Sequence, residues 1–223
     1  MMRKNRLYSN FLIMQNNEEQ IIGQVREYIF NTAPLRLDMS LVAEAVQINL
    51  DEIIMALPSP EILITKMLHY EKESFKKALS QYDFADQSAI DNLIVVGQVV
   101  YNRYQNVHPC VFTRLQGYSP AFPQERYIEM IQQIFDFFIS TINSGMCQGI
   151  FNPEVTLKQP NTNFIKKIIS QENEMISKTQ RFITFGVLFN NYFEEFLQGN
   201  LSNEAWQYFI TRKRFVESLD FGR

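Results

Sequence analysis

Cysteine and histidine are scarce in this chain of 223 residues, which has two of each. Cys110 and Cys147 lack the CxxC spacing of a zinc site, and only His69 and His108 are available to join them. We therefore expect no bound metal, and we expect both cysteines to be small buried apolar residues.

The motifs of the common enzyme classes are also missing. The sequence has no GxSxG, no P-loop, no HExxH, no glycine-rich dinucleotide turn and no ExxH pair of the di-iron kind. Its neighbouring carboxylates, such as Glu71 with Glu73 and Glu194 with Glu195, are typical of solvated helix faces. We therefore expect neither an enzyme nor a cofactor.

Long apolar runs are absent as well. After the basic start MMRKNR, the apolar run from Phe11 to Met14 is far shorter than the core of a signal peptide, and no run could span a bilayer. The net charge of -3 and the pI near 5.5 give no overall attraction to nucleic acid or to an anionic membrane. We expect a cytoplasmic protein with no membrane partner, in which any DNA binding depends on a local patch.

Glycine and proline number only eight each, and 46% of the residues are hydrophobic against 20% charged, which is the composition of a folded protein. What the chain does have is aromatic residues, with 19 Phe and 10 Tyr. That much aromatic surface needs a thick core, an oligomer interface or a cavity to cover it.

Three helical segments are predicted near the start of the chain. Residues 18–31 place their apolar side chains on one helical face behind an acidic first turn. Asp38 and Ser40 are both suitable N-caps for a second helix of about two turns. Asn49 is a suitable N-cap for a short third helix.

Longer helices are predicted for the rest of the chain. Ser59 followed by Pro60 predicts the start of a helix that ends near Ser80. Further helices are expected at 86–104, at 124–146, in a stretch ending near Leu197, and from Ser202 to near Leu219. No segment alternates with period two between turn signals, so we expect an all-α fold without a sheet.

Three stretches of the sequence resemble the TetR family of regulators. Residues 42–49 (VAEAVQIN) and 57–63 (LPSPEIL) fall without a gap on the family signature IAxxAGVSxGTLYxHFxSKExLL. Residues 149–154 (GIFNPE) resemble the turn that often precedes the dimerising helices of that family. The matches cover under a fifth of the chain, and the order of the predicted helices fits the family from end to end. The resemblance implies a three-helix helix-turn-helix head at 18–68 on a larger helical ligand-binding and dimerisation domain at 69–223.

The resemblance also implies that the head contacts double-stranded DNA. The candidate side chains are Arg36, Ser40, Asn49 and Lys66, together with the arm residues Arg3, Lys4 and Arg6. Ser40 and Asn49 are also compatible with plain helix caps, and Lys66 with a solvated side chain.

The head departs from the family pattern in its turn and in its charge. Gln47 stands where the family has glycine, so a turn that keeps a positive φ would be strained. No basic residue lies between Arg36 and Lys66, and residues 21–70 carry three basic and six acidic side chains. Proteins that neutralise six to ten phosphates lose roughly 10³- to 10⁵-fold in affinity as salt rises. This head has few groups with which to make such contacts.

An effector pocket in the larger domain is a further implication of the resemblance. Its walls would be Tyr101, Tyr104, His108, Cys110, Phe112, Phe135, Phe138, Ile142 and Met146, with His108 as the polar group. We expect the effector to be a small apolar or aromatic molecule. The alternative is a plain core, because aromatic residues at helical spacing are more often core than ligand cage.

An aromatic stripe indicates where two chains would meet. Phe182, Phe185, Phe189, Phe193 and Phe196 recur at intervals of three and four. On the corresponding helix of TetR-like proteins such a stripe packs against its two-fold mate, which implies a homodimer. Gly186 would permit close approach of helices, and Trp206, Phe209 and Ile210 would complete the interface. The alternative is that these residues cover the core of their own chain.

Two functional hypotheses share this fold. In the first, the chain is a homodimeric TetR-like transcriptional regulator that binds a DNA palindrome and is released by a small apolar or aromatic effector. In the second, it is a TetR-like protein that has lost operator binding and acts as a ligand-binding or protein-interaction module. The resemblance favours the first and the acidic reading helix the second. An unrelated helical interaction module is the third alternative.

Overall fold

The protein is all-α, as predicted. The computed structural model describes residues 18–85, 87–152 and 183–220, and within them one isolated antiparallel bridge, between Phe151 and Leu201, is the only extended pairing. A first helix covers residues 18–32. It is followed by α2 (Met39–Val46), α3 (Leu50–Ala56), α4 (Pro60–Leu79), α5 (Ala89–Tyr104), α6 (Val111–Gly117), α7 (Gln124–Ile134), α8 (Asp136–Cys147), α10 (Phe185–Asn200) and α11 (Asn203–Asp220).

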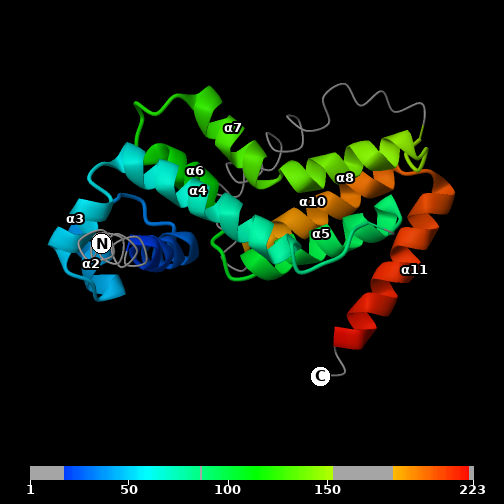
Figure 1. Ribbon diagram of the computed structural model, residues 1–223, viewed down its shortest axis with the longest axis horizontal. Helices are drawn as coiled ribbons and strands as arrows, with labels where there is room; N and C mark the ends of the chain where they lie inside the picture. The colour runs from blue at the N-terminus through cyan, green and yellow to red at the C-terminus, as the bar shows by residue number, and fades with distance from the viewer. Residues whose placement is uncertain (1–17, 86, 153–182, 221–223) are drawn as a thin grey trace, which may run out of the picture.

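The molecule is elongated, with the short helices at one end (Figure 1). The first helix, α2 and α3 gather at that end, and α4 runs from them into the rest of the molecule. Helix α5 lies against both α8 and α10, and α11 packs on α5. We call residues 18–68 the head and the described residues that follow them the body.

Side chains cap the short helices of the head. Asp38 is the N-cap of α2, and its Oδ1 accepts a hydrogen bond from the amide of Ser40 at 2.9 Å. Of the two N-caps predicted for this helix, Asp38 is therefore right, and Ser40 lies in the first turn. Asn49 and Ser59 cap α3 and α4, as predicted. These caps explain why the chain can fit three separate helix starts into so few residues.

The turn between α2 and α3 keeps a left-handed residue although it has no glycine. Gln47 has φ 57° and ψ 38°. The amides of Gln47 and Ile48 donate to the carbonyls of Glu44 and Ala43 at 3.3 and 3.2 Å, which is the Schellman pattern of a helix C-terminus. A residue with a Cβ costs roughly 1–2 kcal/mol in this conformation. The turn is strained as the sequence predicts, but its geometry is kept.

One hydrophobic core runs through head and body. Val25 of the first helix, Ile53 of α3, Phe75 of α4 and Phe189 of α10 are all buried and belong to the same cluster. The domain boundary predicted between residues 68 and 69 lies inside α4, which continues from one region into the other. Head and body therefore share both a continuous helix and a core.

The helix predicted at 124–146 is divided in two. Phe135 has φ -100° and ψ 11°, so it ends α7, and α8 begins at the next residue. Its ring is 1% exposed and stacks on Phe189 of α10, with centroids 5.9 Å apart and an interplanar angle of 12°. The break therefore lies at a residue that is buried against distant helices, which periodicity alone could not indicate.

Helix α6 was not predicted. It covers only Val111–Gly117, between the breaks that the sequence indicates at Pro109 and Gly117. Val111, Phe112 and Leu115 are buried on one side of it. A helix of two turns has too few residues to show a clear period, so its stability comes from this packing.

Helices α5 and α10 approach each other closely at Gly186. A Cβ at Gly186 would lie 2.9 Å from backbone atoms of Tyr101, Tyr104 and Gln105. The close approach that this glycine permits is therefore to α5 of the same chain.

Candidate functional site

The outer side of α2 and α3 presents large apolar side chains to solvent. Of the seven large hydrophobic residues that are exposed in the described part of the chain, five lie on the head, namely Leu35, Leu41, Ile54, Met55 and Ile62. Met55 has the largest exposed fraction, at 78%. Exposed apolar residues concentrated in one region are typical of an interaction surface. We call the exposed side of α2 and α3 the head face.

The head face is also acidic. Its exposed carboxylates belong to Asp38, Glu44, Asp51 and Glu52. Arg36 is exposed beside it, but Lys66 already has two partners. The Lys66 ammonium forms an ion pair with Glu18 and donates to the carbonyl of Ala56 at 2.7 Å. The Lys66 ammonium therefore links the end of α3 to the first helix, and it is not a free positive charge on the surface.

The N-termini of α2 and α3 are occupied by the protein's own side chains. The carboxylate of Asp38 accepts from the amides of Ser40 and Leu41, at 2.9 and 3.3 Å. The side chain of Asn49 accepts from the amide of Asp51 at 2.8 Å. Helix amides of this kind can hold a phosphate without help from a basic side chain. Here the Asp38 carboxylate already accepts from the amides at the start of α2, and the Asn49 side-chain oxygen accepts from an amide at the start of α3.

The four residues predicted to contact DNA have different surroundings. Arg36, Ser40 and Asn49 are exposed, and Asn49 acts as a helix cap. Lys66 is partly buried in its ion pair. The arm residues Arg3, Lys4 and Arg6 lie outside the described residues. DNA contact by any of these residues stays a prediction.

The loop of residues 118–123, which precedes α7, is hydrogen-bonded to the head. The Tyr118 hydroxyl donates to the carbonyl of Pro34 at 2.7 Å, and the buried Ser119 hydroxyl donates to the carboxylate of Glu61 on α4. This hydrogen bond from Ser119 lowers the pKa of Glu61 below its ordinary value. The head is thus held by a loop of the body as well as by α4.

A groove of about 580 Å³ lies between this loop and the head. It is lined by Met55, Pro58, Glu61, Ile62, Thr65, Lys66, Ala121, Phe122, Pro123 and Arg126. The Arg126 guanidinium lies 5.5 Å from the centre of the Phe122 ring. Sequence reasoning missed this groove because its two walls come from segments far apart in the chain.

A buried charge cluster joins the head to the body. Glu71 on α4 is fully buried, and its carboxylate accepts two hydrogen bonds from Arg103 and one from the Tyr104 hydroxyl, each at 2.9 Å. Arg26 of the first helix forms an ion pair with the same carboxylate. The expectation that Glu71 is solvated like Glu73 is therefore wrong. Glu71 is buried because residues of two other helices, Arg26 of the first helix and Arg103 and Tyr104 of α5, contact its carboxylate.

The surroundings of this cluster keep Tyr104 protonated and Arg103 charged, which are the states in which both side chains bind the Glu71 carboxylate. Burial, followed by the charge of Glu71, raises the pKa of Tyr104 well above its ordinary value, so its hydroxyl stays a donor. Burial alone would lower the pKa of Arg103, but the charge and hydrogen bonds of Glu71 raise it. The guanidinium therefore stays charged, and a two-fold hydrogen-bonded pair holds α4 against α5.

Most of the residues predicted to line an effector pocket are part of the aromatic core of the body. Tyr104, Phe112, Phe135, Phe138 and Ile142 are buried in the body, with Cys110, whereas Tyr101, His108 and Met146 are partly exposed. The rings of Tyr104 and Phe112 both meet Phe185, with centroid distances of 5.2 and 5.0 Å. His108 accepts from the amide of Cys110 at 3.2 Å, so its ring is engaged by its own loop. An effector pocket at these residues stays a prediction.

The aromatic stripe of α10 lies inside the chain. Phe185, Phe189 and Phe193 are 0%, 0% and 2% exposed. Phe209 on α11 is 1% exposed and is stacked by the half-buried Trp206, with centroids 5.5 Å apart. Phe182 lies outside the described residues. These side chains cover the core of their own chain, which is the alternative that the sequence left open. Phe196, Trp206 and Ile210 are partly buried at the edge of this core. The homodimer stays a prediction.

The two cysteines differ in their surroundings. Cys110 is buried, as expected. The same expectation is wrong for Cys147, which is exposed in the last turn of α8. In the described ranges, no group of three or more His, Cys, Asp or Glu residues is placed to hold a metal ion.

Comparison with known proteins assigns no family to the chain. No family model matches the sequence, and a search of curated proteins finds no significant match. Among the helices in the described part of the chain, none combines the length and the apolar character needed to cross a membrane.

Proposed function

We propose that this chain is a TetR-like helical protein that has lost operator binding and whose head binds another protein. The observation that carries the proposal is the head face, where Leu41, Ile54 and Met55 are exposed among carboxylates. No basic side chain lies between Arg36 and Lys66 to offset those charges.

The physical argument concerns what a DNA duplex requires. A duplex carries one negative charge for each ~1.7 Å of its length, and proteins bind it largely by releasing the counterions around those charges. Asp51 and Glu52 stand in the first turn of α3, and Asp38 stands at the start of α2, so phosphates at either place would meet a carboxylate. Exposed apolar side chains, in contrast, gain free energy when a protein partner covers them.

Fluorescence anisotropy of the full chain with labelled DNA tests this proposal. We expect no binding to random duplex or to the DNA upstream of its own coding sequence, from low to physiological salt. Preferential binding to the upstream DNA, with a salt dependence, would overturn the proposal and establish an operator-binding regulator.

A charge-reversal variant sharpens the test. Asp51→Lys combined with Glu52→Lys should create DNA binding that weakens steeply with salt, because it gives the first turn of α3 two positive charges. The matched control is Glu125→Lys with Glu129→Lys, which changes the net charge equally on the exposed side of α7. Equal DNA binding by both variants would mean that net charge matters and the geometry of the head does not.

The second candidate is a DNA-binding TetR-like regulator. It is favoured by the left-handed turn at Gln47 between two short helices and by the exposed Asn49 at the start of the second one. In this case the basic residues Arg3, Lys4 and Arg6 would supply the phosphate contacts.

Both candidates include a homodimer. The resemblance implies it, and Phe196, Trp206 and Ile210 are the residues predicted for the interface that are partly exposed. Sedimentation velocity over a range of protein concentrations tests it, because a monomer at every concentration would contradict this part of the proposal.

A further inference from the structure

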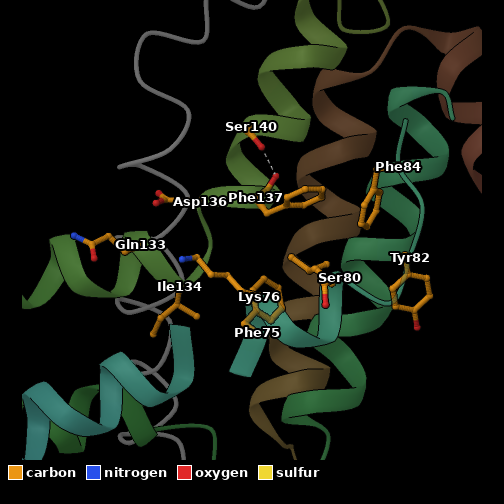
Figure 2. A pocket seen from close by; sticks show the side chains of 11 residues that line it. Phe75, Lys76, Ser80, Tyr82, Phe84, Gln133, Ile134, Asp136, Phe137 and Ser140 are labelled. Atoms are coloured by element: carbon orange, nitrogen blue, oxygen red, sulfur yellow. Dashed lines mark hydrogen bonds between the residues drawn. The ribbon is translucent and has the colours of Figure 1, made fainter. Parts of the chain in front are cut away.

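A pocket with a volume of about 490 Å³ opens at the C-terminal end of α4 (Figure 2). It lies between the last turns of α4, the connection from α4 to α5, and the junction of α7 with α8. The lining residues that carry the argument are Phe75, Lys76, Phe84, Gln133, Asp136 and Phe137. None of the residues predicted to line an effector pocket is among its lining residues.

One side of this pocket is apolar. The rings of Phe84 and Phe137 contact each other with centroids 4.5 Å apart, and Tyr82 lies 6.3 Å from Phe84. Phe75 and Leu79 of α4 add buried side chains to the same wall. Pockets of this size with apolar walls are typical of sites for small organic molecules.

The other side of the pocket carries a charge. In Figure 2 Lys76 extends toward the side formed by Gln133 and Asp136, away from the rings of Tyr82 and Phe84. The partner of Lys76 is Glu73 at 3.2 Å, an exposed pair on the surface of α4. Gln133 accepts from Lys72 at 3.0 Å, which places a second ammonium near the same side. Asp136 is the one acid among the described lining residues.

We propose that this pocket binds a small molecule with an aromatic or branched apolar body and a single carboxylate, which pairs with Lys76. The apolar body lies against Phe84, Phe137 and Leu79, where its burial provides most of the binding free energy. The carboxylate lies at the side of Lys76 and Lys72, whose two ammonium groups outweigh the single negative charge of Asp136 in the lining. The inference does not depend on what the head binds.

The first experiment uses 1-anilinonaphthalene-8-sulfonate, an apolar aromatic monoanion that fluoresces when it is shielded from water. The full chain should bind it saturably. Ser140→Trp, which places a large ring in the pocket from the exposed side of α8, should remove the part of the signal that comes from the pocket and leave any signal from the head face. Ser144→Trp is the matched control, one turn further along α8 and outside the lining, and should leave the signal unchanged.

Displacement of the dye tests the carboxylate. The chain should bind 4-phenylbutyrate about fivefold more tightly than the matched alcohol 4-phenylbutanol, because the charged pair forms only with the acid. Lys76→Gln should remove that preference, whereas Lys77→Gln, exposed on the same helix, should retain it.

Three results would overturn the inference. The first is an absence of saturable dye binding to the unmodified chain, and the second is equal loss of signal in both tryptophan variants. The third is a preference for the acid that survives Lys76→Gln, which would place the carboxylate elsewhere. Circular dichroism of each variant shows whether it retains its helices, so a folding defect is distinguished from a loss of binding.

Discussion

The head and the body of this protein differ in how far their large apolar residues are exposed. In the body the rings of Tyr104, Phe135 and Phe189 are closed inside the chain, whereas in the head Leu41 and Met55 are exposed to solvent. Both regions consist of amphipathic helices, and α4 carries one core through both. The difference therefore does not arise from local structure. The body buries most of its large apolar side chains, with Tyr82 and Tyr208 as exposed exceptions, and the head leaves more of them exposed.

The same contrast holds for charge. In the body the carboxylate of Glu71 has four hydrogen-bonding or ion-pair contacts from three residues and is fully buried. On the head face Glu44 and Glu52 are exposed. Buried charges of the first kind are structural, because an unpaired one would cost several kcal/mol. Exposed charges of the second kind contribute little to stability.

The largest expected effect on the free energy of unfolding comes from replacing a buried apolar residue of the body, in comparison with an exposed one of the head. Phe189→Ala removes a fully buried ring and should lower the free energy of unfolding by roughly 3–5 kcal/mol. Met55→Ala on the head face should change it by less than about 0.5 kcal/mol, because that side chain is 78% exposed. Urea unfolding followed by circular dichroism measures both. Similar losses in the two variants would mean that the head face is covered in the free protein.

The next effect concerns the charges. Glu71→Ala leaves two arginines without their shared carboxylate and should cost about 3 kcal/mol or more. Glu73→Ala breaks only an exposed pair with Lys76 and should cost less than about 1 kcal/mol. The same unfolding measurement compares them. A small loss for Glu71→Ala would show that water reaches the cluster and replaces the carboxylate.

Two glycines in α10 should give smaller changes in stability, of opposite sign, when each is replaced by alanine. Gly186→Ala should destabilise the protein by roughly 1–3 kcal/mol, because its Cβ would meet the α5 backbone at 2.9 Å. A Cβ at Gly199 would meet no neighbouring residue within 4 Å in the described part of the chain, so Gly199→Ala should stabilise the helix, by at most about 1 kcal/mol because the position is near its end. The two changes in thermal midpoint should have opposite signs. If Gly186→Ala proved neutral, α10 and α5 would have to separate easily.

The smallest expected effect is a pH dependence from His108. Burial, followed by the charge of Arg114, lowers the pKa of His108 below its ordinary value of 6.5. The unfolded chain therefore takes up the proton more readily, so the free energy of unfolding falls as the pH drops through 6.5. The change should be less than about 1 kcal/mol, because the ring is partly exposed.

Unfolding at about pH 7.5 and about pH 5.5 tests this prediction. His108→Gln should reduce the difference between the two conditions, and His69→Gln, at an exposed position on α4, should leave it unchanged. A difference that persists in full in His108→Gln would assign the pH dependence to other groups.

The head could be predicted in more detail than the body. The start of α2 at Asp38, of α3 after Asn49 and of α4 after Ser59 follows from side chains that bond to amides two or three residues ahead. Such signals are local, so a sequence displays them. The division falls at Phe135, whose ring packs against Phe75, Tyr104 and Phe189, all remote in the chain. No local pattern contains that information.

The candidate sites show the same contrast between features that depend on neighbouring residues in the chain and features that depend on packing. The acidic character of the head face is visible in the sequence, because it depends only on which residues follow one another. The pocket beside Lys76 is not, because its walls come from α4, from the connection after it and from the α7–α8 junction. The burial of Glu71 was predicted wrongly for the same reason. Its partners Arg26 and Arg103 lie on two other helices.

The sequence by itself determined the all-α class, the capped starts of the head helices and the scarcity of positive charge around α3. Each of these depends on residues within a few positions of one another, or on composition alone. Only the tertiary structure decided that the stripe of Phe185, Phe189 and Phe193 faces inward, and that Glu71 is buried. Helical periodicity states which residues share a face, but the packing of distant helices decides which face is covered.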